Sequence, residues 1–323
     1  MKRILSIAIA ALLAAAALTG CAETTAPTTA ADGGKISVVA TIFPPYDFTR
    51  AIAGDKADIS MLLLPGAETH SFEPTPRDVL KIQNCDVFIY AGGESDDWVK
   101  GILDGVDTSK MKIITLMDCV EAVEEEVVEG MQGEEEAEEP TEGGEEEPEY
   151  DEHVWTSPRN AKLIAQKISD TLCQADAANA ETYRANTMAY LAQLDELDAT
   201  FQAVADNAAR KTIVFGDRFP FRYFADAYGL DYFAAFPGCA TETEASPATV
   251  KFLIDKINAE NIPVIFHIEM SNEKMANTIS EATGAKVLLL HACHNISQAD
   301  FSSGKTYIDL MSANVDALKE ALN

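Results

Sequence analysis

The stretch NAETYRANTMAYLAQLDELDATFQAVADNAA, residues 179–209, has an uninterrupted helical pattern. It contains neither Gly nor Pro, and its large apolar side chains recur at intervals of three to five residues. Such spacing places them along one face of an α-helix. The residues that define this face are Tyr183, Met188, Leu191, Leu194, Leu197 and Phe201. The sequence therefore predicts one long helix with a single apolar stripe.

Short apolar runs alternate with helical patterns on both sides of this helix. Strands are predicted at 36–41, 59–64, 87–90 and 113–116 before it, and at 212–215, 232–234, 264–268 and 287–290 after it. Such alternation predicts parallel sheets covered by helices on both faces. We therefore expect two parallel α/β lobes, 36–175 and 211–323, joined by a linker helix within 176–210. A single eight-stranded barrel is the alternative, and it is disfavoured because no strand separates the long helix from the helical pattern before it.

The chain begins with the pattern of a secretion signal. Lys2 and Arg3 precede an apolar run, 4–18, that is too short to span a bilayer comfortably. The following Leu18-Thr19-Gly20-Cys21 resembles a bacterial lipobox, in which the signal peptide (here 1–20) is removed and the cysteine is acylated. A secretory signal that contains a cysteine by chance is the alternative. Residues 21–35 are predicted to be a flexible tether, so we expect an extracytoplasmic protein with a lipid anchor in the outer face of the cytoplasmic membrane.

The charge of the chain is concentrated in one place. The formal net charge of −29 argues against nucleic acid as a partner, because nucleic-acid-binding proteins usually present basic surfaces. Seventeen of the 53 acidic residues lie between 121 and 152, a stretch without Lys or Arg. Its Glu, Gly and Pro composition predicts an acidic disordered loop over 120–152. This loop is interpreted either as an electrostatic attractor of cations or as a solvated insertion without a role.

The chain has only five histidines, and their placement is informative. His70 follows the predicted strand 59–64, His153 follows the acidic stretch, and His291 and His294 follow the last predicted strand. Asp217 follows the first strand of the second lobe. In open α/β sheets ligands bind beyond the carboxyl ends of the strands, so these groups are expected around one cleft. Imidazoles with carboxylates suit zinc, and manganese or iron less selectively, but each residue also has an ordinary structural interpretation.

Two long motifs carry a specific resemblance. LPGAETHSFEPTPRD at 64–78 and DEHVWTSP at 151–158 strongly resemble the zinc- and manganese-binding lipoproteins of bacterial ABC importers, and the resemblance extends from about residue 36 to residue 322. Members of that family have two Rossmann-like lobes linked by a rigid long helix, with the metal held in the cleft between the lobes. The resemblance implies capture of Zn²⁺, or alternatively Mn²⁺, for delivery to the membrane permease of an ABC importer. A monomer without enzymatic activity is expected.

The resemblance also implies metal ligands, position by position. His70 and His153 match the two histidines of the N-terminal lobe. One alignment gives Asp217 as the third ligand, whereas another gives Arg218, which cannot bind a metal. His291 falls on the fourth position. The reserve candidates are Glu68, His294 and Glu269. Three imidazoles in the expected set favour zinc, since manganese prefers more oxygen ligands.

The remaining cysteines and two other functions complete the predictions. Five cysteines follow Cys21 without a CxxC pair, so no thiolate zinc knuckle is indicated. A disulfide between Cys239 and Cys293 is one interpretation of their placement after second-lobe strands, and metal ligation by their thiolates is the other. A secreted zinc-dependent hydrolase and a surface adhesin or interaction lipoprotein are the alternative functions. Neither HExxH nor GxSxG occurs, which disfavours the hydrolase.

Overall fold

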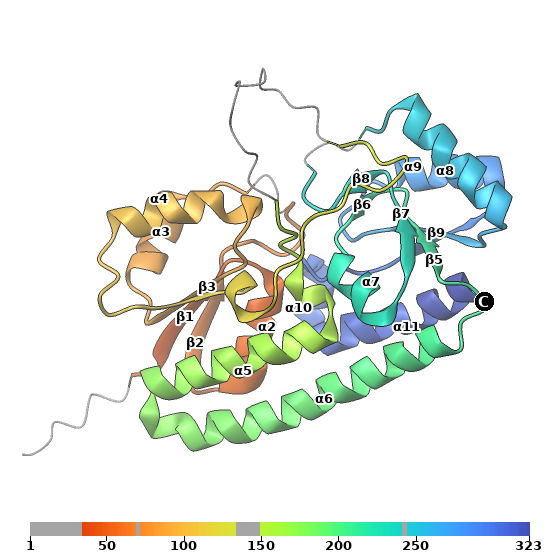
Figure 1. Ribbon diagram of the computed structural model, residues 1–323. Coiled ribbons are helices and arrows are strands. Elements are labelled where there is room, and N and C mark those ends of the chain that lie inside the picture. Colours follow the sequence, from red (N-terminus) through yellow and green to blue (C-terminus); the bar gives the residue numbers. More distant parts are fainter. Residues whose placement is uncertain (1–33, 69–71, 134–148, 241–243) are drawn as a thin grey trace, which may run out of the picture. The chain divides into compact units, whose positions relative to one another are not determined.

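The computed structural model describes residues 34–68, 72–133, 149–240 and 244–323 (Figure 1). The chain divides into two units, Met1–Lys35 and Ile36–Asn323. The predicted signal peptide, Cys21 and nearly all of the predicted tether lie outside the described residues. Within the described ranges, no helix has both the length and the apolarity to cross a membrane. The fold below is that of the second unit.

The N-terminal half of this unit, residues 36–175, is built on a four-stranded parallel sheet. Its strands are β1 (Ile36–Ala40), β2 (Ala57–Met61), β3 (Val87–Tyr90) and β4 (Lys112–Thr115), in the order β2-β1-β3-β4. The inner strands β1 and β3 are mostly buried and apolar, as strands covered on both faces require. The helices α2 (Phe43–Ala53) and α5 (Pro158–Ala175) cover one face, and α3 (Pro76–Gln83) and α4 (Asp97–Gly105) cover the other. α3 begins with a capping box between Thr75 and Asp78.

The C-terminal half, residues 211–323, contains further parallel strands. β5 (Thr212–Val214) pairs with β7 (Asp231–Phe233), β9 (Val264–His267) with β10 (Lys286–Leu289), and β6 (Arg218–Phe219) with β8 (Phe236–Pro237). A parallel bridge between Phe215 and Phe266 links the end of β5 to β9. The helices are α7 (Arg222–Tyr228), α8 (Pro247–Glu260), α9 (Lys274–Thr283), α10 (Gln298–Ser303) and α11 (Tyr307–Leu322). The predicted α/β class is confirmed, and the described strands form open parallel sheets instead of a barrel.

α6 (Ala180–Asp206) is the predicted long helix. Its 27 residues correspond to a length of about 40 Å. It packs against α2 and α5 of the N-terminal half and against α11 of the C-terminal half, and Figure 1 shows it running below both halves. The buried face differs from the prediction at Met188, which is 74% exposed, while Thr187 and Tyr190 are buried. The helical period is the reason, because the buried positions 183, 187, 190, 194, 197 and 201 advance by alternating steps of four and three.

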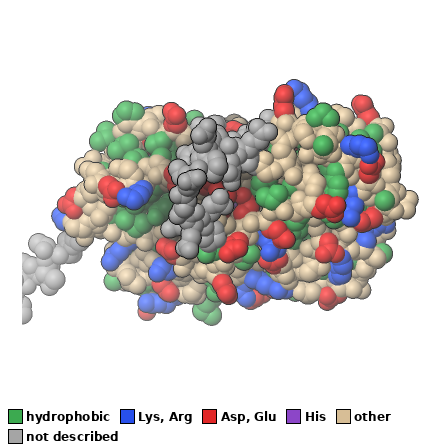
Figure 2. Space-filling view, turned by 45° about the horizontal axis from the view of Figure 1, so that its top comes forward, with side chains coloured by type: hydrophobic (Ala, Val, Ile, Leu, Met, Phe, Trp, Pro, Cys, Tyr) green, Lys and Arg blue, Asp and Glu red, His purple; other side chains and the backbone are tan. Residues whose placement is uncertain are grey.

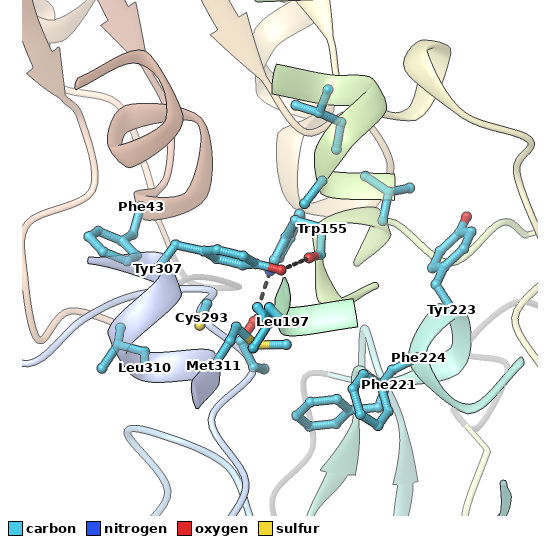
Figure 3. Close-up of a cluster of buried hydrophobic side chains, with 14 of the residues drawn as sticks. Phe43, Trp155, Leu197, Phe221, Tyr223, Phe224, Cys293, Tyr307, Leu310 and Met311 are labelled. Atoms are coloured by element: carbon cyan, nitrogen blue, oxygen red, sulfur yellow. Dashed lines mark hydrogen bonds between the residues drawn. The ribbon is translucent and has the colours of Figure 1, made fainter. Parts of the chain in front are cut away.

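One apolar cluster extends through both halves, from β1 and α5 through α6 to β9 and α11. Figure 3 shows part of it, with the Tyr307 hydroxyl pointing at the backbone carbonyl of Trp155, to which it donates a hydrogen bond of 2.7 Å. The backbone N–H of Tyr307 donates to a carboxylate oxygen of Asp47 at 2.7 Å. Because close-packed interiors tolerate little displacement, this shared core holds Trp155 and its neighbours in one position relative to α11.

The acidic stretch is ordered at both ends, which differs from the prediction of a disordered loop over 120–152. Glu124 forms an antiparallel bridge with Tyr150, and the Asp151 N–H donates to the carbonyl of Val123 at 3.0 Å. Residues 134–148 lie outside the described residues. Although the stretch is mostly acidic, four of its apolar side chains pack against the core. They are Val120, Val123, Val128 and Met131.

The surface of the unit has no dominant basic region on the face shown in Figure 2. Asp and Glu side chains border the grey residues there, and elsewhere they alternate with Lys and Arg. Among the described side chains of this face, no continuous basic patch is visible.

Candidate metal centre

His153 lies at the end of the acidic stretch, immediately before the short helical turn Val154–Thr156. Its side chain is buried, and one carboxylate oxygen of Asp151 accepts its backbone N–H at 2.7 Å and lies 3.1 Å from its Nδ1. Burial acts to lower the pKa of His153, but the charge and the hydrogen bond of Asp151, together with the charges of Glu152 and Glu125, outweigh burial and raise it. A carboxylate at Nδ1 fixes the tautomer in which Nε2 carries the lone pair. This arrangement is typical of metal-binding histidines.

His294 approaches His153 from the C-terminal half. The two imidazole rings are 5.0 Å apart and nearly perpendicular. The His294 N–H donates to Glu269 Oε1 at 2.8 Å, and the Ala292 N–H donates to Glu269 Oε2 at 2.7 Å. Between these residues Cys293 has φ +61°, a left-handed conformation that is uncommon for a residue other than glycine. Glu269 therefore holds a strained loop whose turn brings His294 to His153.

Trp155 connects the two histidine-bearing segments. Its indole Nε1–H donates to the carbonyl of Ala292 at 2.9 Å, and its ring lies 4.9 Å from that of His294. The loop after β10 is thus bonded directly to the segment that carries His153. The relative position of the two imidazoles is set by both halves of the unit.

Glu152 completes a group of three metal-binding side chains. One ligand atom from each of Glu152, His153 and His294 can be chosen so that all three lie within 4.8 Å of one another, and all three residues are buried. Glu152 Oε2 accepts the backbone N–H of Ser95 at 3.0 Å, whereas Oε1 has no hydrogen-bond partner among the described residues. Burial raises the pKa of Glu152. A buried carboxylate oxygen normally has a partner, and a cation held by two imidazoles would supply one.

The group opens into a cleft that both halves line. Arg218, from β6, forms an ion pair of 3.0 Å with Glu68 from the N-terminal half, and it also donates to the carbonyl of Ala240. Gly238 lies against the other side of His153. A Cβ at this position would be 3.1 Å from His153 Nδ1 and Cε1, a tight contact that glycine avoids as the backbone approaches the imidazole. The ion pair between Arg218 and Glu68 therefore lines the cleft, and the backbone of Gly238 lies against the imidazole of His153.

A sequence model of one protein family matches residues 38–321, and the family is described as zinc-uptake complex component A, periplasmic (ZnuA). The chain belongs to the ZnuA family. The predicted resemblance to metal-binding components of importers is thereby confirmed.

Known ZnuA-family proteins are similar over most of this chain. The high-affinity zinc uptake system protein ZnuA of Bacillus subtilis is 32% identical over 302 residues, which cover 90% of this chain and 88% of that protein. The zinc-binding lipoprotein AdcA of Streptococcus pneumoniae is 33% identical over 289 residues, 89% of this chain but only 56% of AdcA. The chain thus spans about half the length of its AdcA relatives. The Zn(II)-bound ZnuA-like domain of that AdcA superposes with a TM-score of 0.72 at 30% identity, covering 90% of this chain and 99% of the domain.

The N-terminal ligands predicted for this ZnuA-family chain are His70 and His153. His153 belongs to the group described above, whereas His70 lies outside the described residues. The motif that carries His70 is anchored next to the group, because Asn295, adjacent to His294, donates from its side chain to the carbonyls of Leu64 and Ala67 at 2.9 and 2.7 Å. The first motif and the His294 loop are therefore neighbours.

The C-terminal ligands predicted from sequence are placed differently. The carboxylate of Asp217 accepts the backbone N–H groups of Arg218 and Ile268. His291 Nδ1 accepts the N–H of Cys293 at 3.0 Å, and neither Asp217 nor His291 belongs to the group around His153 among the described residues. The left-handed turn at Cys293 is the reason, since it directs His294 toward His153. Of the reserve candidates, His294 is in the group, Glu269 accepts backbone hydrogen bonds, and Glu68 pairs with Arg218.

The disulfide that was one interpretation of Cys239 and Cys293 is not formed. Both are free, buried thiols. The other described cysteines are also free; Cys85 is buried, whereas Cys119 and Cys173 are partly exposed. Burial raises the pKa of Cys239 and of Cys293, with Glu152 and Glu125 adding to the effect at Cys239 and Glu269 and Asp47 at Cys293. The two thiols thus lie in different surroundings. High pKa values also disfavour the thiolate form that binds metals.

Glu152 is the functional candidate that sequence reasoning missed. It was assigned to the acidic loop, where one carboxylate is indistinguishable from many others. Its position directly before His153 was the available signal. Only burial and the approach of His294 separate it from its neighbours.

Proposed function

We propose that this chain captures zinc outside the cytoplasm and delivers it to the membrane permease of an ABC importer. The observation that carries the proposal is the buried group of Glu152, His153 and His294, formed from both halves of the unit. His70 is proposed as a further ligand on the strength of its motif. Membership in the ZnuA family supports the transport role, as do zinc-binding relatives that match nearly the whole chain.

Zinc is proposed over manganese because of the donor atoms. Two imidazoles and one carboxylate, with His70 as a third imidazole, suit a tetrahedral zinc site, whereas manganese prefers a larger number of oxygen ligands. A site filled by four protein groups leaves no position for a reacting water. Capture is therefore favoured over the hydrolase alternative, because catalytic zinc sites keep one open position.

The cellular context follows from the N-terminal segment. We propose cleavage after residue 20, acylation of Cys21 and a tether over 21–35, so that the protein acts as a monomer anchored at the outer face of the membrane. The lobe boundaries 36–175, 176–210 and 211–323 are proposed with it. The names of zinc-binding lipoproteins among the relatives support an anchored, extracytoplasmic protein.

The test uses protein that starts at residue 22 and so lacks the lipidation site. We expect one tightly bound zinc per chain, measured by metal analysis and by competition with a chelator. His153→Ala, His294→Ala and Glu152→Ala should each weaken binding by about 100-fold or more, beyond the range typical of residues that only orient a ligand. Glu152→Gln would keep the shape of the side chain and lose its charge, and should also weaken binding. His267→Ala is the matched control, because this histidine at the end of β9 contacts the carbonyl of Ile268 and lies outside the group.

Two results would contradict the proposal. Absence of stoichiometric zinc from the wild-type protein would contradict the proposed function. Equal losses of zinc affinity in His267→Ala and His294→Ala would contradict the assignment of the site. Asp217→Asn and His291→Ala test the ligands that the resemblance implies, and we expect them to affect affinity less than His294→Ala.

A further inference from the structure

We infer that residues 120–132 form a strap that crosses from the N-terminal to the C-terminal half and holds the backbone at 238–239 against His153, with Glu125 as the positioning residue. The inference rests on the proposed zinc site and adds a role for the first part of the acidic stretch. Sequence composition suggested that this part was a solvated loop.

The strap is fixed at its base beside His153. The Val123 carbonyl accepts the Asp151 N–H, and the Glu125 N–H donates to the carbonyl of Glu149 at 2.9 Å. The Val123 N–H in turn donates to the hydroxyl of Tyr223, which donates to the Asp151 carbonyl at 2.8 Å. Tyr223 belongs to α7 of the C-terminal half. The base therefore bonds to both halves.

The far end of the strap is bonded to the C-terminal half. The Gln132 N–H donates to the carbonyl of Ala235 at 2.9 Å, and the Gln132 side-chain oxygen accepts the Ser246 N–H at 2.7 Å. Gly130 has φ +84°, and a Cβ there would be only 2.0 Å from the ring of Phe252. In Figure 1 this yellow segment passes beside β8, and its far end contacts α8, the helix that carries Phe252. Contacts at the base, in the middle and at the far end distinguish the strap from a loop that is held only where it leaves the fold, although Val127 between them is 58% exposed.

Two consecutive glutamates in the middle of the strap face different partners. Glu125 Oε1 accepts the backbone N–H of Cys239 at 3.2 Å. The Glu126 carboxylate contacts the Tyr232 hydroxyl at 3.3 Å and Arg222 at 3.5 Å, and its side chain is half exposed. Of these two glutamates, Glu125 is therefore the one that connects the strap to the backbone beside His153.

The connection from Glu125 to the metal site has one intermediate. Glu125 binds the N–H of Cys239, and the preceding Gly238 lies so close to His153 that a Cβ would be 3.1 Å from its ring. Asp151 holds the same imidazole at Nδ1. His153 is thus positioned by one carboxylate directly and by Glu125 through the backbone. Loss of the Glu125 contact should let this wall move away and give His153 additional freedom.

The test compares Glu125→Ala with Glu126→Ala in protein that starts at residue 22. Glu125→Ala should weaken zinc binding about 10-fold or more, as residues that orient metal ligands do, and should speed loss of zinc to a chelator. Glu126→Ala should change neither quantity, because its contacts lie away from His153. Glu125→Gln keeps an oxygen that can accept the Cys239 N–H, so it should recover most of the affinity. With Co²⁺ as a spectroscopic probe, only Glu125→Ala should alter the visible absorption bands.

Each outcome decides the inference. Equal effects of Glu125→Ala and Glu126→Ala would overturn it, since they would show only a general loosening of the strap. Unchanged zinc binding in Glu125→Ala would also overturn it while leaving the proposed function intact, whereas wild-type protein without zinc would end both. If Glu125→Ala does not fold, Gln132→Ala serves as the second variant. It loosens the far end and should speed zinc loss, and an unchanged rate would overturn the role of the strap.

Discussion

Glu269 joins the end of β9 to the loop that carries His294, and its replacement by glutamine tests how that loop is held. One carboxylate oxygen accepts the N–H of His294 at 2.8 Å and the other accepts the N–H of Ala292 at 2.7 Å. The side chain is buried, so water cannot replace either bond readily. We predict that Glu269→Gln lowers the free energy of unfolding and also weakens zinc binding.

The size of the effect follows from the two hydrogen bonds. A hydrogen bond to a charged group contributes about 1.5–3 kcal/mol, and glutamine can accept only one of the two with its single oxygen. Its amide NH₂ then faces a backbone N–H, which stays buried without an acceptor. The free energy of unfolding should fall by about 2–4 kcal/mol. The lost hydrogen bond and the buried N–H without an acceptor both contribute, but they are partly the same effect and do not simply add. Zinc affinity should fall about 10–100-fold, since His294 loses a group that orients it.

The assay is urea unfolding of the metal-free protein together with chelator competition for zinc. Glu273→Gln is the control, because Glu273 lies in the same connection, is about half exposed and lies 3.9 Å from His267, outside the metal group. Its unfolding free energy and zinc affinity should match the wild type. An unfolding free energy for Glu269→Gln within about 0.5 kcal/mol of wild type, with unchanged zinc affinity, would refute the reasoning.

Three further predictions concern other contacts. Burial raises the pKa of Asp96 from 3.8 to about 7, so its protonated form stabilises the fold at low pH and this contribution is lost as pH rises through 7. Asp96→Asn should therefore raise the Tm of metal-free protein above pH 7 and have little effect near pH 4, and parallel Tm curves would contradict this. Arg218 and Glu68 are 3.0 Å apart with Glu68 42% exposed, so a double-mutant cycle of Arg218→Met and Glu68→Gln should give a coupling of about 0.5–1 kcal/mol in urea unfolding. Additive single effects would argue against it. Trp155→Phe removes the bond to the buried Ala292 carbonyl and should cost about 1–3 kcal/mol in the same assay, and a cost near zero would show that this contact does not hold the loop.

Much of the fold could be predicted because its signals are local. The strand Val87–Tyr90 has the predicted boundaries, since its apolar run lies within a few neighbouring positions. Met188 was misplaced because apolar character alone does not define the buried face of a helix. Thr187 and Tyr190 occupy helix positions that face the core, and they are buried although each carries a hydroxyl group.

Composition misled the prediction for the acidic stretch. A count of glutamates predicts disorder, yet Val123 and Met131 pack against the core and Gln132 pairs with the C-terminal half. A few apolar side chains at the right spacing outweigh many charged ones, because the charged groups stay at the surface and lose little solvation. The surface against which Val123 and Met131 pack is formed by other segments of the chain, so the acidic stretch alone does not reveal it.

The sequence by itself determined the α/β class, the long helix, the family and His153 as a member of the candidate metal centre. These follow from periodicity and from motifs whose residues are neighbours in the chain. Only the tertiary structure decided that His294 and Glu152 accompany His153, while Asp217 and His291 bind backbone groups instead. The physical reason is that ligand geometry depends on a left-handed turn at Cys293, on buried hydrogen bonds from Glu269 and on close approach at Gly238. The groups that meet here are separated in the sequence, as Glu269 and His294 are by 25 positions, and no local pattern records their contacts.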